Sequence, residues 1–152
     1  MDLAKIVRKD DDGLEAWVEF IRGFRVRLKF ISRAAFLSLT AKHRKISWNQ
    51  QTRSREEDVD TDGVNTEFIQ KYVLDWEGLT PAILLDMMPV ADPSALDEIE
   101  VIDFTTNNAK LLMSECADFE RFVTESAMDV SNFQSIHKEE LAGNSKSTPS
   151  GS

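Results

Sequence analysis

One short stretch of this chain has the residue types and spacing of a metal-binding loop. Residues 58–63 read Asp-Val-Asp-Thr-Asp-Gly, which places carboxylates at alternate positions and a glycine at the sixth, as a calcium loop begins. The twelfth position of such a loop must supply a bidentate glutamate, but here it is Ile69, and the normally apolar eighth is Asn65. We therefore expect no metal and no cofactor, and interpret the segment as an acidic, solvated loop.

Groups suited to catalysis are few and scattered. The chain has two histidines, His43 and His137, and neither stands beside a recognisable nucleophile signature. Its one cysteine, Cys116, falls at helical spacing with apolar residues and is expected to be buried and inert. Phosphate-binding glycine loops and Cys/His clusters with metal spacing are also missing from the sequence. We expect a protein that is not an enzyme.

Charge is distributed unevenly along the chain. The net charge is −9, yet residues 20–55 contain ten basic residues and no acidic one, whereas 21 acidic and five basic residues follow. Fields of one sign steer oppositely charged surfaces together, so we expect Arg25 and Arg27 to speed association with a partner. The alternative is that the two halves screen one another within the monomer.

The basic stretch also raises nucleic-acid binding as an alternative function. Residues 22–55 include Phe30 and Trp48, which are suited to stack on bases. Against this interpretation, the acidic remainder would repel phosphate, and no helix-turn-helix or zinc-finger spacing accompanies the basic residues. Nucleic-acid binding, or another structural or interaction role for residues 22–55, is therefore kept as the alternative and is not the expected function.

Hydropathy patterns predict the elements that carry these residues. Alternation over residues 14–20 and 24–30, joined by a turn that contains Gly23, predicts an antiparallel β-hairpin with one buried face. Ser32 and Asn65 are suited to cap two helices, which we place at residues 33–45 and 65–76. Between these helices, residues 46–63 are polar and periodic in nothing, which predicts a mobile loop.

The second half of the chain is predicted to be mostly helical. Caps or apolar spacing favour helices at residues 82–88, 106–115, 118–130 and 131–141, and residues 101–104 are a candidate short strand. We predict an α+β fold with one domain at residues 1–141, its N-terminal hairpin packed on the helical remainder, and a disordered tail at residues 142–152. The expected core comprises Phe24, Val26, Leu28, Trp76, Leu112, Phe119, Phe122 and Val123.

Three segments taken in order resemble the tail assembly chaperones of long-tailed bacteriophages. They are Phe-Arg-Val-Arg-Leu-Lys-Phe-Ile-Ser-Arg at 24–33, Asp-Trp-Glu-Gly-Leu-Thr-Pro at 75–81, and the helical region at 108–123. The resemblance implies a non-enzymatic protein that binds the long, helical tape measure protein, keeps it soluble and helps to recruit tail tube subunits. It also implies the short form of a protein that some phages extend by a ribosomal frameshift.

The predicted helices between residues 106 and 141 have more apolar residues than a single buried helix face can accommodate. Leu111 sits beside two further apolar residues, and Met128 and Phe133 extend the pattern, so we expect these three near the surface and in contact with the partner. The resemblance implies the tape measure and tail tube proteins as partners. The sequence predicts no membrane partner and a place in the cytoplasm, and it leaves self-association open. The resemblance implies that this is the host cytoplasm and that the protein is absent from the mature virion.

Overall fold

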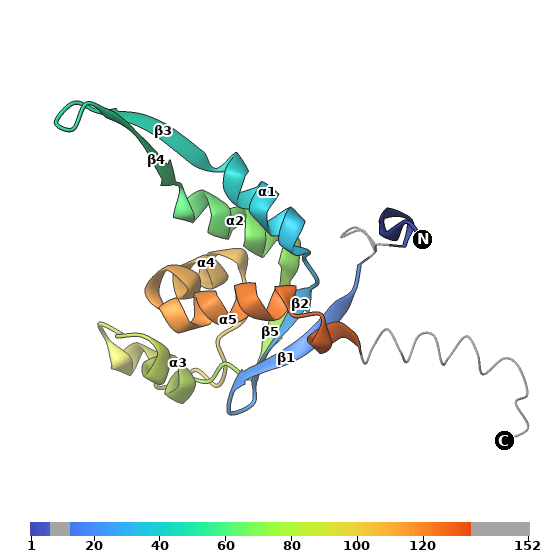
Figure 1. The fold of residues 1–152 in the computed structure, drawn as a ribbon. Coiled ribbons are helices and arrows are strands. Elements are labelled where there is room, and N and C mark those ends of the chain that lie inside the picture. Colours follow the sequence, from blue (N-terminus) through green and yellow to red (C-terminus); the bar gives the residue numbers. More distant parts are fainter. Residues whose placement is uncertain (7–12, 135–152) are drawn as a thin grey trace, which may run out of the picture.

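A three-stranded antiparallel sheet forms the centre of the molecule (Figure 1). The structure is a computed structural model that describes residues 1–6 and 13–134. A short 3-10 helix, Leu3–Lys5, comes first, and the sheet has the order β1 (Glu15–Ile21), β2 (Phe24–Lys29), β5 (Val73–Glu77). Arg22 and Gly23 join β1 to β2 with φ angles of 41° and 88°, two positive values as in a type I′ hairpin turn. The predicted N-terminal hairpin is confirmed.

Helices surround this sheet, and two of them lie directly against it. They are α1 (Arg33–Lys42), α2 (Thr61–Tyr72), α3 (Pro81–Met87), α4 (Thr106–Glu115) and α5 (Ala117–Met128), with a 3-10 turn at Pro93–Leu96. α5 packs against β1 and β2, α2 packs against β2 and β5, and α4 packs on both α2 and α5, while Figure 1 shows α3 near the turn between β1 and β2. The hydroxyls of Ser32, Thr80 and Thr105 each accept a hydrogen bond from an amide in the first turn of a helix. The α+β fold is therefore confirmed.

Aromatic side chains fill the space between sheet and helices. Phe24 and Phe119 stack with ring centroids 5.8 Å apart, and the Trp76 ring meets both edge-on. All but one of the residues expected in the core are buried. The exception, Phe122, is partly buried and packs against Phe20 at the margin of the core.

The helix expected at residues 65–76 begins and ends four residues earlier, as α2. The Asp60 carboxylate caps α2 by accepting from the Gly63 amide at 3.2 Å, so Asn65 lies buried inside the helix instead of starting it. Residues 73–77 leave the helix and form β5, which pairs with β2 through Trp76 and Val26. The prediction failed because Val73 and Trp76 are three residues apart, a spacing that fits one face of a helix. The same spacing also fits one face of a strand when the strand contains a register shift, as β5 does.

The segment expected to be a loop, residues 46–63, is instead mostly a second hairpin. Strands β3 (Arg44–Asn49) and β4 (Ser54–Val59) pair along their full length in a separate two-stranded sheet. Figure 1 shows this hairpin projecting from the ends of α1 and α2, away from the other helices. Its residues show no alternation in sequence because neither face is buried against the rest of the chain.

The candidate strand at residues 101–104 pairs with no other strand that the structure describes. The segment is fixed by two other bonds: the Ile102 amide donates to the Leu79 carbonyl, and the Trp76 indole donates to the Ile102 carbonyl, both at 2.8 Å. At the C-terminus a helical turn begins at Ser131, whereas the rest of that predicted helix, His137 and the tail at 142–152 lie outside the described residues.

Candidate partner-binding groove

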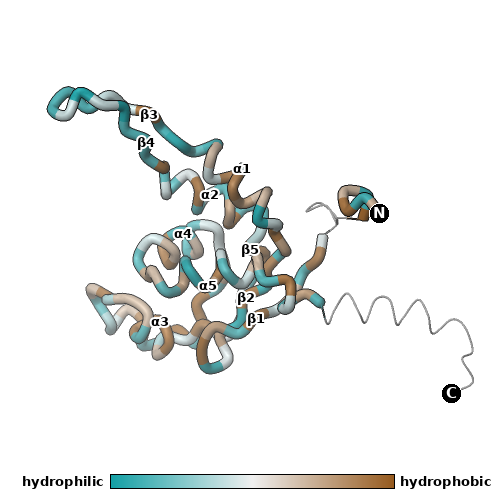
Figure 2. Tube along the Cα trace, in the orientation of Figure 1, coloured by the Kyte–Doolittle hydropathy of each residue, from teal (hydrophilic) through white to brown (hydrophobic). Residues whose placement is uncertain are grey.

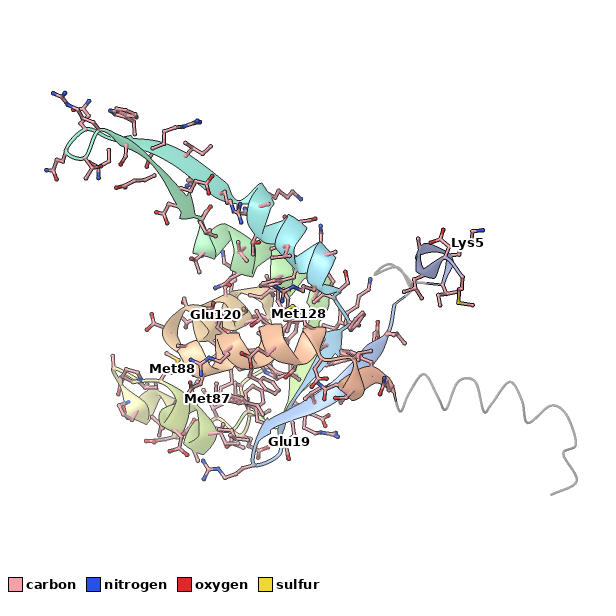
Figure 3. The ribbon with its side chains drawn as sticks, viewed as in Figure 1. Lys5, Glu19, Met87, Met88, Glu120 and Met128 are labelled. Carbon is pink, nitrogen blue, oxygen red and sulfur yellow. The ribbon has the colours of Figure 1, made fainter. Side chains whose placement is uncertain are left out.

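An apolar groove opens between α3, α4 and the extended segment that joins them. Its volume is about 280 Å³. The groove is lined by Trp76, Leu79, Leu84, Met88, Pro89, Val90, Ala91, Ile102, Asn108, Leu111 and Leu112. Figure 3 shows Met87 and Met88 on the side of α3 that faces α4 and α5. A concave site with this lining offers apolar area to bury and few groups that form hydrogen bonds, so its chemistry suits apolar side chains.

The side-chain N–H donors of the groove are engaged within the chain. The Trp76 indole N–H is used by the Ile102 carbonyl, and the Asn108 amide donates to the Asp103 carbonyl at 3.0 Å. None of the lining residues is titratable. The groove therefore offers shape and apolar area to a ligand, with no acid, base or nucleophile on its walls.

Acidic residues dominate the segment that forms one side of the groove. Between Lys71 and Lys110 the sequence has no basic residue, and residues 86–103 carry Asp86, Asp92, Asp97, Glu98, Glu100 and Asp103. Of these carboxylates, Asp86 forms an ion pair with Arg22 of the β1–β2 turn. Exposed apolar side chains accompany them at Leu85, Ile99 and Val101. The surface near the groove thus combines negative charge with exposed apolar area.

The three residues expected to contact a partner lie in different environments. Leu111 lines the groove and has 51% of its surface exposed. Met128 is partly buried against the core. Phe133 is fully buried, with its ring 5.5 Å from that of Phe30, so the expectation that it lies near the surface is wrong. Its position after α5 lets it turn back onto the sheet, which the local spacing did not indicate.

Sequence reasoning missed most of the groove. Pro89, Val90 and Ala91 come from a segment for which no helix or strand was predicted, and the position of Trp76 in the groove depends on β5, which the spacing did not predict. Composition could have indicated the groove, because apolar residues recur between acidic ones in this segment and no predicted helix or strand there would bury them.

The arginines expected to steer partners are paired with carboxylates on the exposed face of the sheet. Arg25 forms an ion pair with Glu77 and lies 5.6 Å over the Trp17 ring, while Arg27 pairs with Glu15. The β2 strand thus lies between acidic residues of both its neighbours, which accounts for part of the uneven charge along the sequence. A steering role for Arg25 and Arg27 stays a prediction.

Two lysines and a histidine surround Glu67 at the base of the β3–β4 hairpin. Lys42 and His43 lie 3.1 Å from one carboxylate oxygen, and Lys71 donates to the other at the same distance. Burial raises the pKa of Glu67, but hydrogen bonds from Lys42, His43 and Lys71 outweigh it and lower the pKa to about 2. The cluster links the end of α1 to α2, so we interpret it as a stabilising contact between the helices and not as a catalytic group.

The residues that imitate a calcium loop are separated by the fold. Asp58 lies on β4, whereas Asp60 caps α2 and Asp62 belongs to its first turn. In the part of the chain that the structure describes, no three His, Cys, Asp or Glu side chains gather closely enough to hold a metal ion. Cys116 is a buried free thiol, as expected. Among the described helices, none is long and apolar enough to cross a membrane.

Comparison with protein families gives a match over most of the chain. The model of the YdaY prophage protein family matches residues 31–144, which include the groove, the Glu67 cluster and the β3–β4 hairpin. No curated protein and no solved structure matches the chain. Because the match spans most of the sequence, the chain belongs to the YdaY prophage protein family.

Proposed function

We propose that this prophage protein is a tail assembly chaperone that binds and solubilises a tape measure protein and helps to recruit tail tube subunits. It acts in the host cytoplasm, without enzymatic activity, and is absent from the mature virion. The observation that carries the proposal is the apolar groove between α3 and α4, whose walls suit an apolar helix stripe. Membership of a prophage family and the resemblance of three segments to tail assembly chaperones support it.

The groove is matched to a helical partner in two respects. Its apolar lining can accept side chains spaced one helical turn apart, and Leu111 supplies an exposed apolar contact at its margin. The carboxylates of residues 86–103 favour a partner with basic residues beside that stripe, because charge complementarity sets the rate and register of encounter. A long, aggregation-prone helical protein offers many such stripes.

Co-expression with the long helical protein encoded downstream in the same prophage tests the proposal. The measurement is the soluble fraction of that protein with the wild-type chain, with Leu111→Asp, and with Leu37→Asp. Leu37 is the matched control, because it is 50% exposed against 51% for Leu111 and lies on α1, away from the groove. We expect solubilisation by the wild type and by Leu37→Asp, and its loss with Leu111→Asp.

Two results would contradict this function. If the long protein is equally insoluble with and without the chain, the chaperone function fails for this form of the protein. If Leu37→Asp and Leu111→Asp act alike, the groove is not the binding surface.

Nucleic-acid binding is the weaker alternative. Five of the ten basic residues between 20 and 55 are paired with carboxylates: Arg22, Arg25, Arg27, Lys42 and Lys45. Affinity for random DNA at low and moderate salt separates the two functions, because a chaperone of this kind is expected not to bind DNA at moderate salt.

A further inference from the structure

The β3–β4 hairpin has apolar side chains that no other part of the described chain buries. Every residue of the two strands is exposed except Asn49, which is half-buried. Ile46, Trp48 and Val59 are 58%, 60% and 41% exposed. Isolated two-stranded hairpins are marginally stable in water, and added strands or a packing partner stabilise them. Figure 2 shows the hairpin as mostly hydrophilic, with hydrophobic patches on β3 and at the base of β4.

The two edges of the hairpin differ in how they are protected. Strand β4 carries Glu56, Glu57 and Asp58 in succession, and a run of like charges discourages another strand from pairing there. Strand β3 is uncharged from Ile46 to Asn49 and contains two residues that favour strands, Ile46 and Trp48. On its outer side, β3 has no strand neighbour among residues 1–6 and 13–134. The β3 edge is therefore the one open to strand addition.

The ladder determines which backbone groups of β3 reach that edge. The His43 carbonyl accepts from the Asp60 amide at 2.9 Å, so the hydrogen-bonded pairs with β4 fall at odd-numbered residues of β3. The even-numbered residues Arg44, Ile46 and Trp48 then direct their N–H and C=O groups outward. Their side chains also share one face of the hairpin.

We propose that the β3 edge pairs with the β3 edge of a second copy across a two-fold axis, joining two hairpins into a four-stranded antiparallel sheet of order β4-β3-β3′-β4′. Pairing through even-numbered residues with Ile46 opposite Ile46 of the other copy satisfies the outward groups of both strands. The acidic β4 strands then become the outer edges, which limits the assembly to two chains.

Side-chain chemistry favours this register. Arg44 faces Trp48 of the other copy, a cation beside an indole, and the same contact recurs by symmetry. On the opposite face, Lys45 lies beside the other copy's Ser47, so no two cations oppose one another directly. The two Ile46 side chains meet at the axis between these Arg44–Trp48 contacts. This surface is separate from the groove between α3 and α4, so the dimer does not depend on the proposed function.

Sedimentation at a series of protein concentrations tests the dimer, with Ile46→Lys and Val59→Lys compared with the wild type. Val59→Lys is the matched control, because it places the same side chain on the same face but at the β4 edge. We expect the wild type and Val59→Lys to dimerise alike, and Ile46→Lys to raise the dissociation constant by at least about tenfold by setting two cations at the axis.

Backbone hydrogen exchange gives a readout of the register. In the dimer, the amides of Arg44, Ile46 and Trp48 should exchange more slowly as the protein concentration rises, while the outward amides of β4 should not change. A wild type that stays monomeric at high concentration, equal weakening by both lysine variants, or protection confined to β4 would each overturn the proposal. Protection of β3 that appears only when DNA is added would also overturn it and would assign the hairpin to nucleic acid.

Discussion

The two hairpins of this protein have the same local architecture but different surroundings. In the β1–β2 hairpin, one face bears Phe24, Val26 and Leu28, all fully buried under α5, and the other face bears paired charges. In the β3–β4 hairpin both faces are exposed, and its polar residues outnumber its apolar ones (Figures 1 and 2). The buried face of the β1–β2 hairpin therefore contributes to the stability of the fold, whereas the β3–β4 hairpin is mainly exposed to solvent.

The physical consequence concerns what stabilises each hairpin. Ordering the backbone of a residue costs about 1–2 kcal/mol, and the first hairpin offsets this by removing large apolar side chains from water. The second hairpin has only its ladder, its cross-strand pairs and its attachment to α1 and α2. We therefore expect changes in the first to affect global unfolding and changes in the second to affect mainly local opening and association.

Replacing one tryptophan in each region gives the largest expected contrast. Trp76→Ala should lower the free energy of unfolding by about 3–5 kcal/mol, because Trp76 is 5% exposed and donates to the Ile102 carbonyl. Trp48→Ala removes a side chain that is 60% exposed and should change it by less than about 0.5 kcal/mol. Chemical denaturation in dilute solution, where the chain is monomeric, measures both. Similar costs would show that the β3–β4 hairpin belongs to the cooperative core.

Two glycines, Gly23 and Gly78, test whether close backbone packing at the end of the sheet positions the chain that leads from β5 to α3. A Cβ on Gly78 would lie 2.2 Å from the Gly23 carbonyl oxygen, and Gly78 has φ of 78°. Gly78→Ala should therefore destabilise by about 3 kcal/mol, from left-handed strain and a clash with backbone. Gly23→Ala has similar strain, with φ of 88°, but open space around the new atom, and should cost about 1 kcal/mol. Equal melting temperatures for the two variants would contradict the close approach.

The contrast between the hairpins also explains which elements the sequence predicted. Alternation revealed the first hairpin because one of its faces is buried, and hydroxyl caps at Ser32 and Thr105 marked helix starts because capping is local chemistry. The second hairpin has no buried face, so it left no alternation. Strand β5 was missed because its position depends on pairing with β2, a contact distant in sequence. Leu111 was found from composition, but the groove around it forms only after α3 and α4 approach one another.

The Glu67 cluster tests how firmly the second hairpin is anchored to the helices. Glu67→Gln should lower the free energy of unfolding by about 2 kcal/mol at pH 7, because Lys42, His43 and Lys71 lose their shared carboxylate. The pKa of Glu67 is lowered in the folded state from 4.5 to about 2, so its stabilisation is complete above pH 4.5 and is lost as pH falls through 2.

Denaturation of the wild type and Glu67→Gln between pH 7 and pH 2 measures this dependence. The two curves should converge toward pH 2, where the wild-type carboxyl becomes protonated and neutral like the amide. A difference that stays constant with pH would mean that packing of the side chain, and not its charge, ties α1 to α2.

Charge reversal on the outer face of each hairpin gives the smallest expected difference. In the sheet, Arg25 lies between Glu19 and Glu77 on neighbouring strands, so Arg25→Glu would place three carboxylates in one cross-strand row. The side chains are about half exposed, so the loss should be about 1 kcal/mol and should shrink as salt is added. Arg55→Glu is the matched control: Arg55 faces Trp48 across the ladder, where no carboxylate stands opposite it. We expect no measurable change in unfolding there, and a salt-independent loss at Arg25 would instead assign its contribution to packing over Trp17.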